Sequence, residues 1–193
     1  MATPEEPISA VCISRLVGAG GEEIGRLLAE RLGFRYVDAE IVVAAAQAEG
    51  LYPESVAAAE ERGVGRLLEV DFHRFEPTEE VRELIRTTIR STAAKGNVVI
   101  VAHAASFALA GDGVLRVLAV ASPETRVARL QEDQGVDPRT AKKVLDESDR
   151  ARKEYLERFY GIGRELPTHF DLVVNTDVLG VARAVDVIAA AAT

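Results

Sequence analysis

Several residue types are scarce in this sequence, and each scarcity narrows what the chain can be. Its 193 residues include one cysteine and no tryptophan, and aromatic residues make up 5%. The single cysteine, Cys12, excludes an internal disulfide and hence the class of small disulfide-rich secreted domains. Cys12 lies within an apolar run, so we expect a packed core residue rather than a nucleophile.

Long hydrophobic runs are also missing. No apolar run reaches the roughly 18–20 residues that a membrane-spanning helix needs. The first seven residues are acidic and lack the basic start and apolar stretch of a signal peptide. Together with the lone cysteine, these absences predict a cytoplasmic protein that makes no contact with a membrane.

Positive charge is outweighed by negative charge. The chain has 23 Lys and Arg against 31 Asp and Glu, a formal net charge of −8. This balance argues against general nucleic-acid binding, which relies on cations that neutralise phosphates. One segment is nevertheless basic, and we expect it to contact a phosphorylated ligand; it carries Arg116, Arg126, Arg129, Arg139, Lys142, Lys143, Arg150, Arg152, Lys153, Arg158 and Arg164.

The remaining composition is that of a globular protein, with 48% hydrophobic and 28% charged residues. We find no repeat or linker and expect one domain over residues 1–193. Short apolar runs predict strands at 8–13, 34–38, 97–101, 114–120 and 170–175. Helical patterns lie between and after them, at 22–32, 39–70, 78–95, 123–134, 138–160 and 178–191. This alternation predicts an α/β fold with a parallel sheet whose strand ends bind ligands.

A glycine cluster joins the first predicted strand to the first helix. It reads Gly18-Ala19-Gly20-Gly21, and Glu22 follows it directly. Glycines let backbone N–H groups curl around an anion, and the helix N-terminus adds partial positive charge. The alternative is a tight turn without a ligand. Four glycines within eight residues (18–25) exceed what such a turn requires, so we predict a phosphate cradle.

Neither common nucleotide-binding motif fits this loop completely. The dinucleotide motif G-x-G-x-x-G requires a glycine at position 23, where this chain has glutamate, although Asp38 stands where a ribose-binding acid would lie. The mononucleotide P-loop requires a lysine after its last glycine, and this chain has Gly21 there. Motif matching alone therefore leaves both classes open.

The wider sequence resembles one known family. Residues 13–15 read Ile-Ser-Arg, and residues 18–25 read Gly-Ala-Gly-Gly-Glu-Glu-Ile-Gly. This resembles the pattern I-S-R-x-x-G-S-G-G-x-E-I of the cytidylate kinase-like proteins, a divergent branch of the nucleoside monophosphate kinases that also lacks the lysine. The resemblance continues, in order, through residues 32–41, 95–101, 148–155, 159–161 and 170–176.

The resemblance implies a three-layer P-loop kinase-like fold, with about five parallel strands flanked by helices and a helical lid over 136–164. Residues 39–95 would form the acceptor side or a dimer face, which leaves a homodimer among the options. The implied reaction moves a phosphoryl group from ATP, with Mg²⁺, to a nucleoside monophosphate, with CMP favoured. A second hypothesis is a catalytically weak nucleotide-binding protein with a regulatory role, and a third is an NAD(P)-dependent oxidoreductase.

Site roles follow from the same resemblance. The amides of Gly18, Ala19, Gly20, Gly21 and Glu22 would cradle the donor phosphates, and Arg15 would supply the charge of the missing lysine. Arg126 and Arg129 would flank the nucleotide base or enter the lid. Arg150 and Arg152 would act from the lid, because guanidinium groups suit phosphate oxygens. The alternative is that these arginines pair with Asp146, Glu147 and Asp149 on solvated helices.

On the acceptor side, Asp38 would face the nucleotide or a metal-bound water, or else cap a helix that starts at Ala39. No side chain is assigned as a metal ligand. The family commonly has Gly-Arg-Gly-Ala where this chain has Ala102-His103-Ala104-Ala105. His103 would bind the acceptor phosphate only when protonated, and its ordinary pKa is about 6.5. This change, and Glu22 in place of an often basic residue, favour the second hypothesis.

Overall fold

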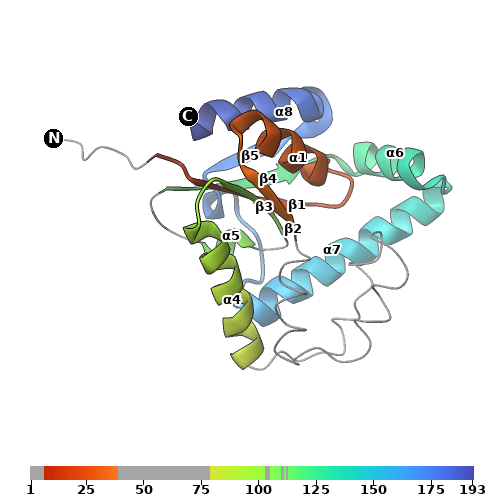
Figure 1. Ribbon diagram of the computed structural model, residues 1–193. Helices are drawn as coiled ribbons and strands as arrows, with labels where there is room; N and C mark the ends of the chain where they lie inside the picture. Colours follow the sequence, from red (N-terminus) through yellow and green to blue (C-terminus); the bar gives the residue numbers. More distant parts are fainter. Residues whose placement is uncertain (1–6, 39–78, 103–104, 110, 112) are drawn as a thin grey trace.

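The computed structural model describes residues 7–38, 79–102, 105–109, 111 and 113–193 (Figure 1). Its strands are β1 (Ala10–Arg15), β2 (Arg35–Asp38), β3 (Val98–Val101), β4 (Val114–Val120) and β5 (Leu172–Asn175). Its helices are α1 (Gly21–Leu32), α4 (Glu79–Ala94), α5 (Ala105–Ala108), α6 (Pro123–Gln134), α7 (Pro138–Tyr160) and α8 (Thr176–Ala192), with a 3-10 turn at Pro167–His169. The predicted helix 39–70 and connector 71–77 lie outside the described residues.

The five strands form one parallel sheet in the order β2-β3-β1-β4-β5. β1 is central, with Ile13 in register with Val101 of β3 and Val117 of β4. All carboxyl ends therefore meet at one edge of the sheet, as the strand–helix alternation predicts. The predicted five-stranded parallel sheet flanked by helices is confirmed. The first strand begins and ends two residues later than predicted, because its pairing with β4 continues to Arg15.

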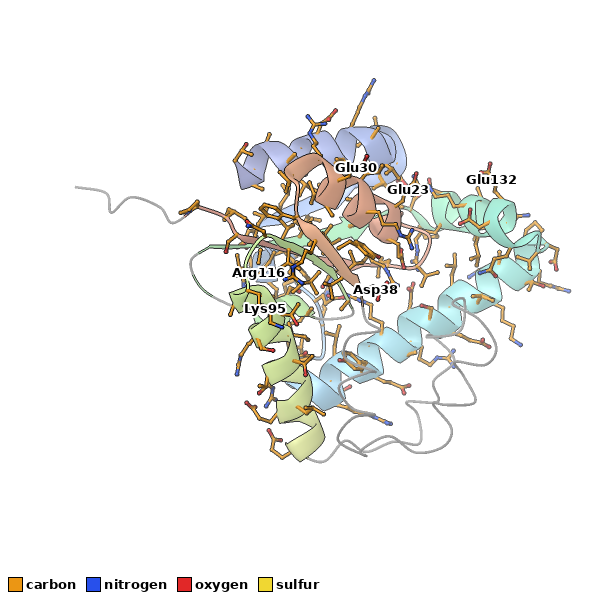
Figure 2. The ribbon with its side chains drawn as sticks, in the orientation of Figure 1. Glu23, Glu30, Asp38, Lys95, Arg116 and Glu132 are labelled. Carbon is orange, nitrogen blue, oxygen red and sulfur yellow. The ribbon has the colours of Figure 1, made fainter. Side chains whose placement is uncertain are left out.

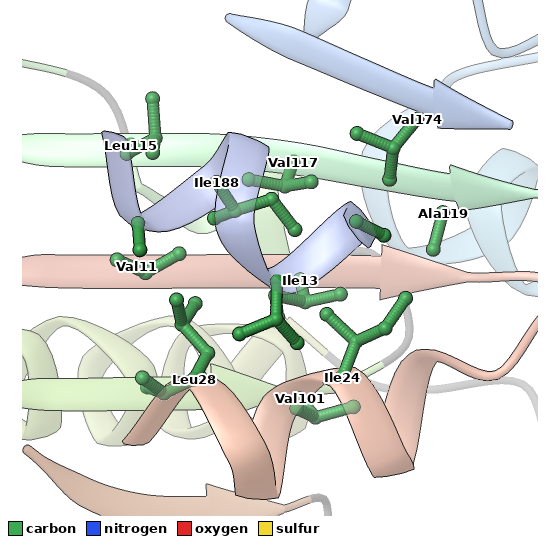
Figure 3. Close-up of a cluster of buried hydrophobic side chains, with 14 of the residues drawn as sticks. Val11, Ile13, Ile24, Leu28, Val101, Leu115, Val117, Ala119, Val174 and Ile188 are labelled. Atoms are coloured by element: carbon green, nitrogen blue, oxygen red, sulfur yellow. The ribbon is translucent and has the colours of Figure 1, made fainter. Parts of the chain in front are cut away.

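Alternate residues of β1 supply two separate cores, since successive strand side chains point to opposite faces. Val11 and Ile13 face α1 and α8, where Ile24 and Ile188 complete a buried cluster (Figure 3). Ala10 and Cys12 face α4 and α5. Figure 1 shows these helix pairs on opposite sides of the sheet, which gives three layers. Complete burial raises the pKa of the Cys12 thiol to about 12, so Cys12 is the core residue the sequence predicts.

The long helix α7 crosses below the sheet (Figure 1). Near its start, Ala141 and Leu145 pack against Leu130 of α6. Near its end, the ring of Tyr160 lies 5.8 Å from that of Phe107 in α5. Both ends of α7 are thus attached to the sheet domain. Among the described residues, no helix combines the length and the hydrophobicity needed to span a membrane.

Local signals set the ends of α6 and α7 where the sequence places them. Ser122 and Asp137 cap the N-termini by accepting hydrogen bonds from backbone N–H groups, and a proline occupies the first turn of each helix. The four-residue helix α5 and the 3-10 turn were not predicted, because segments this short have no detectable periodicity.

Helix α1 approaches the sheet closely at Gly25. A Cβ atom on Gly25 would lie under 3.0 Å from Cγ2 of Val101 and 3.1 Å from Cε2 of Tyr36. Its backbone has ordinary helical geometry, so only the lack of space requires glycine here.

We expect Gly25→Ala to lower the free energy of unfolding by about 1–3 kcal/mol through overpacking. In an uncrowded helix the same change would stabilise by about 0.5–1 kcal/mol, so the sign identifies the cause. Urea denaturation measures it. Gly163→Ala is the control, because nothing lies within 4 Å of a Cβ there; a stabilising effect at Gly25 would contradict the close approach.

Candidate phosphate-binding site

The glycine loop connects β1 to α1 at the carboxyl edge of the sheet. Gly18 and Gly20 have φ values of +76° and +80°, in the left-handed region that favours glycine. Between them, the Ala19 N–H donates to the Leu16 carbonyl at 3.0 Å. The chain therefore turns sharply from the central strand into the helix.

The start of α1 presents unsatisfied backbone donors. The first intrahelical bond runs from the Ile24 N–H to the Gly20 carbonyl at 2.9 Å. The N–H groups of Gly21, Glu22 and Glu23 thus have no acceptor within the helix, and the cap residue Gly20 offers no side chain. Figure 2 shows Glu23 in this first turn. Such donors, with the helix dipole, favour an anion.

The carbonyl groups of the loop are bonded on its other side. Arg126 of α6 donates its Nε–H to the Val17 carbonyl at 2.6 Å. Arg129 donates from Nη1 to the Gly18 carbonyl at 3.1 Å. The hydroxyl of Thr176 donates to the Ala19 carbonyl, at an Oγ1–O distance of 3.0 Å. Three successive carbonyls are thereby held by side chains from α6 and α8, away from the donors at the start of α1.

Arg126 is the deepest of these anchors, with a relative exposure of 4%. Its two Nη atoms donate to the carboxylate oxygens of Asp149 in α7 at 2.8 and 2.7 Å. Gly18 packs directly on it, since a Cβ there would lie 2.9 Å from the Arg126 carbonyl oxygen. Arg126 therefore joins the loop, α6 and α7.

Arg129 and Thr176 form the second anchor. Arg129 donates from Nη1 to the Thr176 hydroxyl at 2.8 Å and from Nη2 to the Thr176 carbonyl at 3.0 Å. Thr176 is fully buried at the junction of β5 and α8. Arg126 and Arg129 were predicted to contact the nucleotide; the structure places both beside the loop, bonded to protein groups. A nucleotide contact for either stays a prediction.

Arg15 lies over the first turn of α1. It forms an ion pair with Glu22, and its side chain is 16% exposed. A Cβ built on Gly21 would lie under 3.0 Å from Cβ and Cγ of Arg15. The structure thus brings together Arg15, Gly21 and Glu22, which the sequence assigns to one site.

The predicted lid arginines differ from each other. Arg152 is buried and donates from Nε and Nη2 to the carboxylate of Glu165 at 2.8 and 2.7 Å. Arg150 lies exposed on α7. Of the acids considered as partners, Asp149 pairs with Arg126, while Asp146 and Glu147 pair with lysines one turn earlier. The sequence analysis missed Glu165, because it follows α7 in a segment without periodic signal.

Asp38, which was predicted to face the acceptor, stands at the carboxyl end of β2, in register with Val101 (Figure 2). Burial, and secondarily the Asp38 carboxylate, raise the pKa of nearby Tyr36. His103, and the helix starting at Ala39 that Asp38 would cap, lie outside the described residues. Within those residues, no cluster of three His, Cys, Asp or Glu side chains could hold a metal ion.

Two further residues of the site escaped the sequence analysis. The buried hydroxyl of Ser14, at the end of β1, lies 2.9 Å from that of Ser106 in α5. Thr176 directly follows β5, and its hydroxyl donates to the Ala19 carbonyl of the loop. A hydroxyl residue at the end of a buried strand is a signal that could have indicated both.

Comparison with known proteins agrees with this geometry. A sequence profile of the cytidylate kinase-like family matches residues 10–178. The chain belongs to the cytidylate kinase-like family. A cytidylate kinase of Ignicoccus hospitalis is 28% identical over 181 residues, which are 94% of this chain and 97% of that protein.

Solved structures share the fold of this cytidylate kinase-like protein. An uncharacterized protein from Eubacterium ventriosum has a TM-score of 0.71 at 19% identity, covering 95% of this chain and 98% of that one. A shikimate kinase from Bacteroides thetaiotaomicron has a TM-score of 0.53 at 16% identity, covering 93% and 95%. The family membership and the P-loop kinase-like fold predicted from the sequence are confirmed.

In this cytidylate kinase-like protein, we expect Asp149→Asn to lower the free energy of unfolding by about 1–3 kcal/mol, because it leaves the buried Arg126 guanidinium with one acceptor fewer. Urea denaturation measures the change. Asp146→Asn is the matched control on the same helix, since its pair with Lys142 is exposed and worth about 0–1 kcal/mol. Equal losses in the two variants would show that Asp149 does not hold Arg126.

Proposed function

We propose that this protein transfers the γ-phosphoryl group of ATP to a nucleoside monophosphate, with CMP as the favoured acceptor. An oxygen of the acceptor phosphate attacks the γ-phosphorus, the bond to the β,γ-bridging oxygen breaks, and ADP leaves. Such transfers depend on positioning and on positive charge more than on an acid–base pair. The proposal therefore needs a phosphate site with oriented donors rather than a catalytic dyad.

One observation carries the proposal: the glycine loop has its carbonyls bonded on one side and leaves the N–H groups of Gly21, Glu22 and Glu23 at the other. Three anchored carbonyls fix the loop before any ligand arrives, so little ordering is required on binding. This geometry fits the phosphates of ATP, because the donors and the helix dipole favour the same charge. The family membership supports the same interpretation.

Mg²⁺ would enter with ATP as part of the substrate. In the generic P-loop, the residue directly after the lysine supplies a hydroxyl to the metal; counting from Gly20, that position is Glu22, which pairs with Arg15. The described residues thus fit the phosphates better than the metal. When bound, the ion would neutralise charge on the β- and γ-phosphates.

The remaining roles are those that the family resemblance implies. Asp38 would face the acceptor, and the 39–95 region would contribute the rest of that subsite. The segment 136–164, which contains α7, would serve as the lid, with Arg152 and Arg150 reaching the phosphates. Residues 1–193 would form a single domain with these parts. Two copies of the chain would be able to form a homodimer through the 39–95 region.

A second candidate function is nucleotide binding with little turnover, in a regulatory role. Its support is that Arg126 and Arg152, both buried, are each in a bidentate pair with a carboxylate, and that His103 stands where the family commonly has arginine. The strand order argues against the third hypothesis, an NAD(P)-dependent oxidoreductase. Dinucleotide-binding sheets place the second strand beside the first, whereas here β3 lies between β1 and β2.

An ADP-release assay with CMP, UMP, dCMP and AMP tests the proposal. We expect turnover with a cytidine acceptor to exceed turnover with AMP by at least tenfold, or about 1.4 kcal/mol of discrimination. ATP binding by calorimetry is measured in parallel. Binding of ATP without turnover on any acceptor would refute the kinase and favour the second candidate.

We also expect Glu22→Gln to tighten ATP binding by roughly fivefold, because a like charge a few Å from phosphate in a partly solvated site costs about 1 kcal/mol. Calorimetry at fixed ionic strength measures this. Glu30→Gln, at the exposed far end of α1, is the matched control and should leave the affinity unchanged (Figure 2). Weaker binding by Glu22→Gln would mean that its carboxylate supports the site.

A further inference from the structure

At two positions of the loop, a glycine and a basic residue are exchanged relative to the generic P-loop. The motif G-x-x-x-x-G-K has glycine at its first position and lysine at its seventh. Counted from Gly20, its sixth position, these fall at residues 15 and 21. This chain has arginine at the first and glycine at the second.

The structure shows that these two positions share one space. A Cβ on Gly21 would lie under 3.0 Å from Cβ and Cγ of Arg15 and 3.3 Å from its Cδ. Real Cβ atoms essentially never come this close to another atom. Gly21 lies in the first turn of α1 and its φ is not positive, so the backbone itself would accept any residue. A side chain at position 15 therefore requires glycine at position 21.

The side chain of Arg15 lies against the first turn of α1. Its stem passes over Gly21, and its Nη2 pairs with the carboxylate of Glu22 in the first turn of α1. The side chain is mostly buried but retains 16% exposure, whereas that of Glu22 is 41% exposed. The cation is thus paired with a carboxylate that is accessible to solvent, and that carboxylate belongs to the same helical turn as the N–H groups of residues 21–23.

We propose that Arg15 and Gly21 are a reciprocal exchange of the P-loop glycine and lysine, in which Arg15 binds the ATP phosphates from the first loop position. The inference rests on the proposed function and assigns its phosphate-binding cation. Arginine suits this place because its planar fork can bond two phosphate oxygens at once. Glycine at position 21 then leaves room for the side chain of Arg15. The loop keeps a phosphate-binding cation, which is supplied by position 15 in place of position 21.

A double-mutant cycle tests this exchange with four full-length proteins: wild type, Arg15→Gly, Gly21→Lys, and the double variant that restores the generic motif. ATP affinity, thermal stability and turnover are measured for each. We expect Gly21→Lys alone to lower the melting temperature, because the introduced lysine side chain collides with the stem of Arg15. We expect Arg15→Gly alone to weaken ATP binding by roughly ten- to hundredfold, the usual effect of losing a hydrogen bond to a charged group.

The double variant should recover most of both losses, with a melting temperature near wild type and an ATP affinity within about tenfold of it. Ala190→Lys is the control for added charge, since position 190 is exposed near the C-terminal end of α8, at the end opposite to its junction with the loop. Arg15→Gln keeps most of the stem over Gly21 and removes only the charge. It should bind ATP as weakly as Arg15→Gly while melting close to wild type.

If the effects of Arg15→Gly and Gly21→Lys on the melting temperature are additive, the side chains at positions 15 and 21 do not compete for the same space. If Arg15→Gln and wild type bind ATP with equal affinity, the guanidinium of Arg15 does not bind the phosphates. That result would stand even if turnover shows that the protein is a kinase. Conversely, if wild type binds ATP and the cycle behaves as expected but no acceptor is phosphorylated, the kinase proposal fails and the exchange stands. Absence of ATP binding by wild type would refute both.

Discussion

The site depends on the hydrogen bonds that hold three loop carbonyls, those of Val17, Gly18 and Ala19. A loop of glycines is intrinsically permissive and would be expensive to order at the moment of binding. Here two arginines and a threonine order it in advance, from helices that the sheet positions independently. Because these side chains bond the carbonyls, they do not use the backbone donors at the start of α1.

Carboxylate partners account for several arginines of the basic segment 116–164. In the described part of the chain, Arg116, Arg126 and Arg152 each form a bidentate pair with a carboxylate, so three of the eleven basic residues of that segment serve internal structure. For the two buried arginines, Arg126 and Arg152, breaking the pair is costly, because the remaining charge cannot regain water. The density of positive charge in a sequence segment therefore overstates the charge available to a ligand.

The sequence was informative where structure is local or periodic. The short apolar runs, the helical patterns and the glycine-rich turn all depend on neighbouring residues, and the sheet, α6, α7 and the loop were predicted from them. The partners of the arginines were not, because they are set by tertiary distances. Arg126 meets Val17 across 109 residues of chain. No spacing rule reaches that far, and the family resemblance named the residues without naming their contacts.

The Arg126 side chain has a thermodynamic consequence, since it is bonded both to the loop and to Asp149 of α7. Neither element can be displaced without straining the other, so their equilibria are linked. By reciprocity, whatever fixes the position of α7 must alter the anion affinity of the loop by the same factor that an anion alters the preference of α7. One guanidinium would thus transmit occupancy of the loop along a helix of 23 residues.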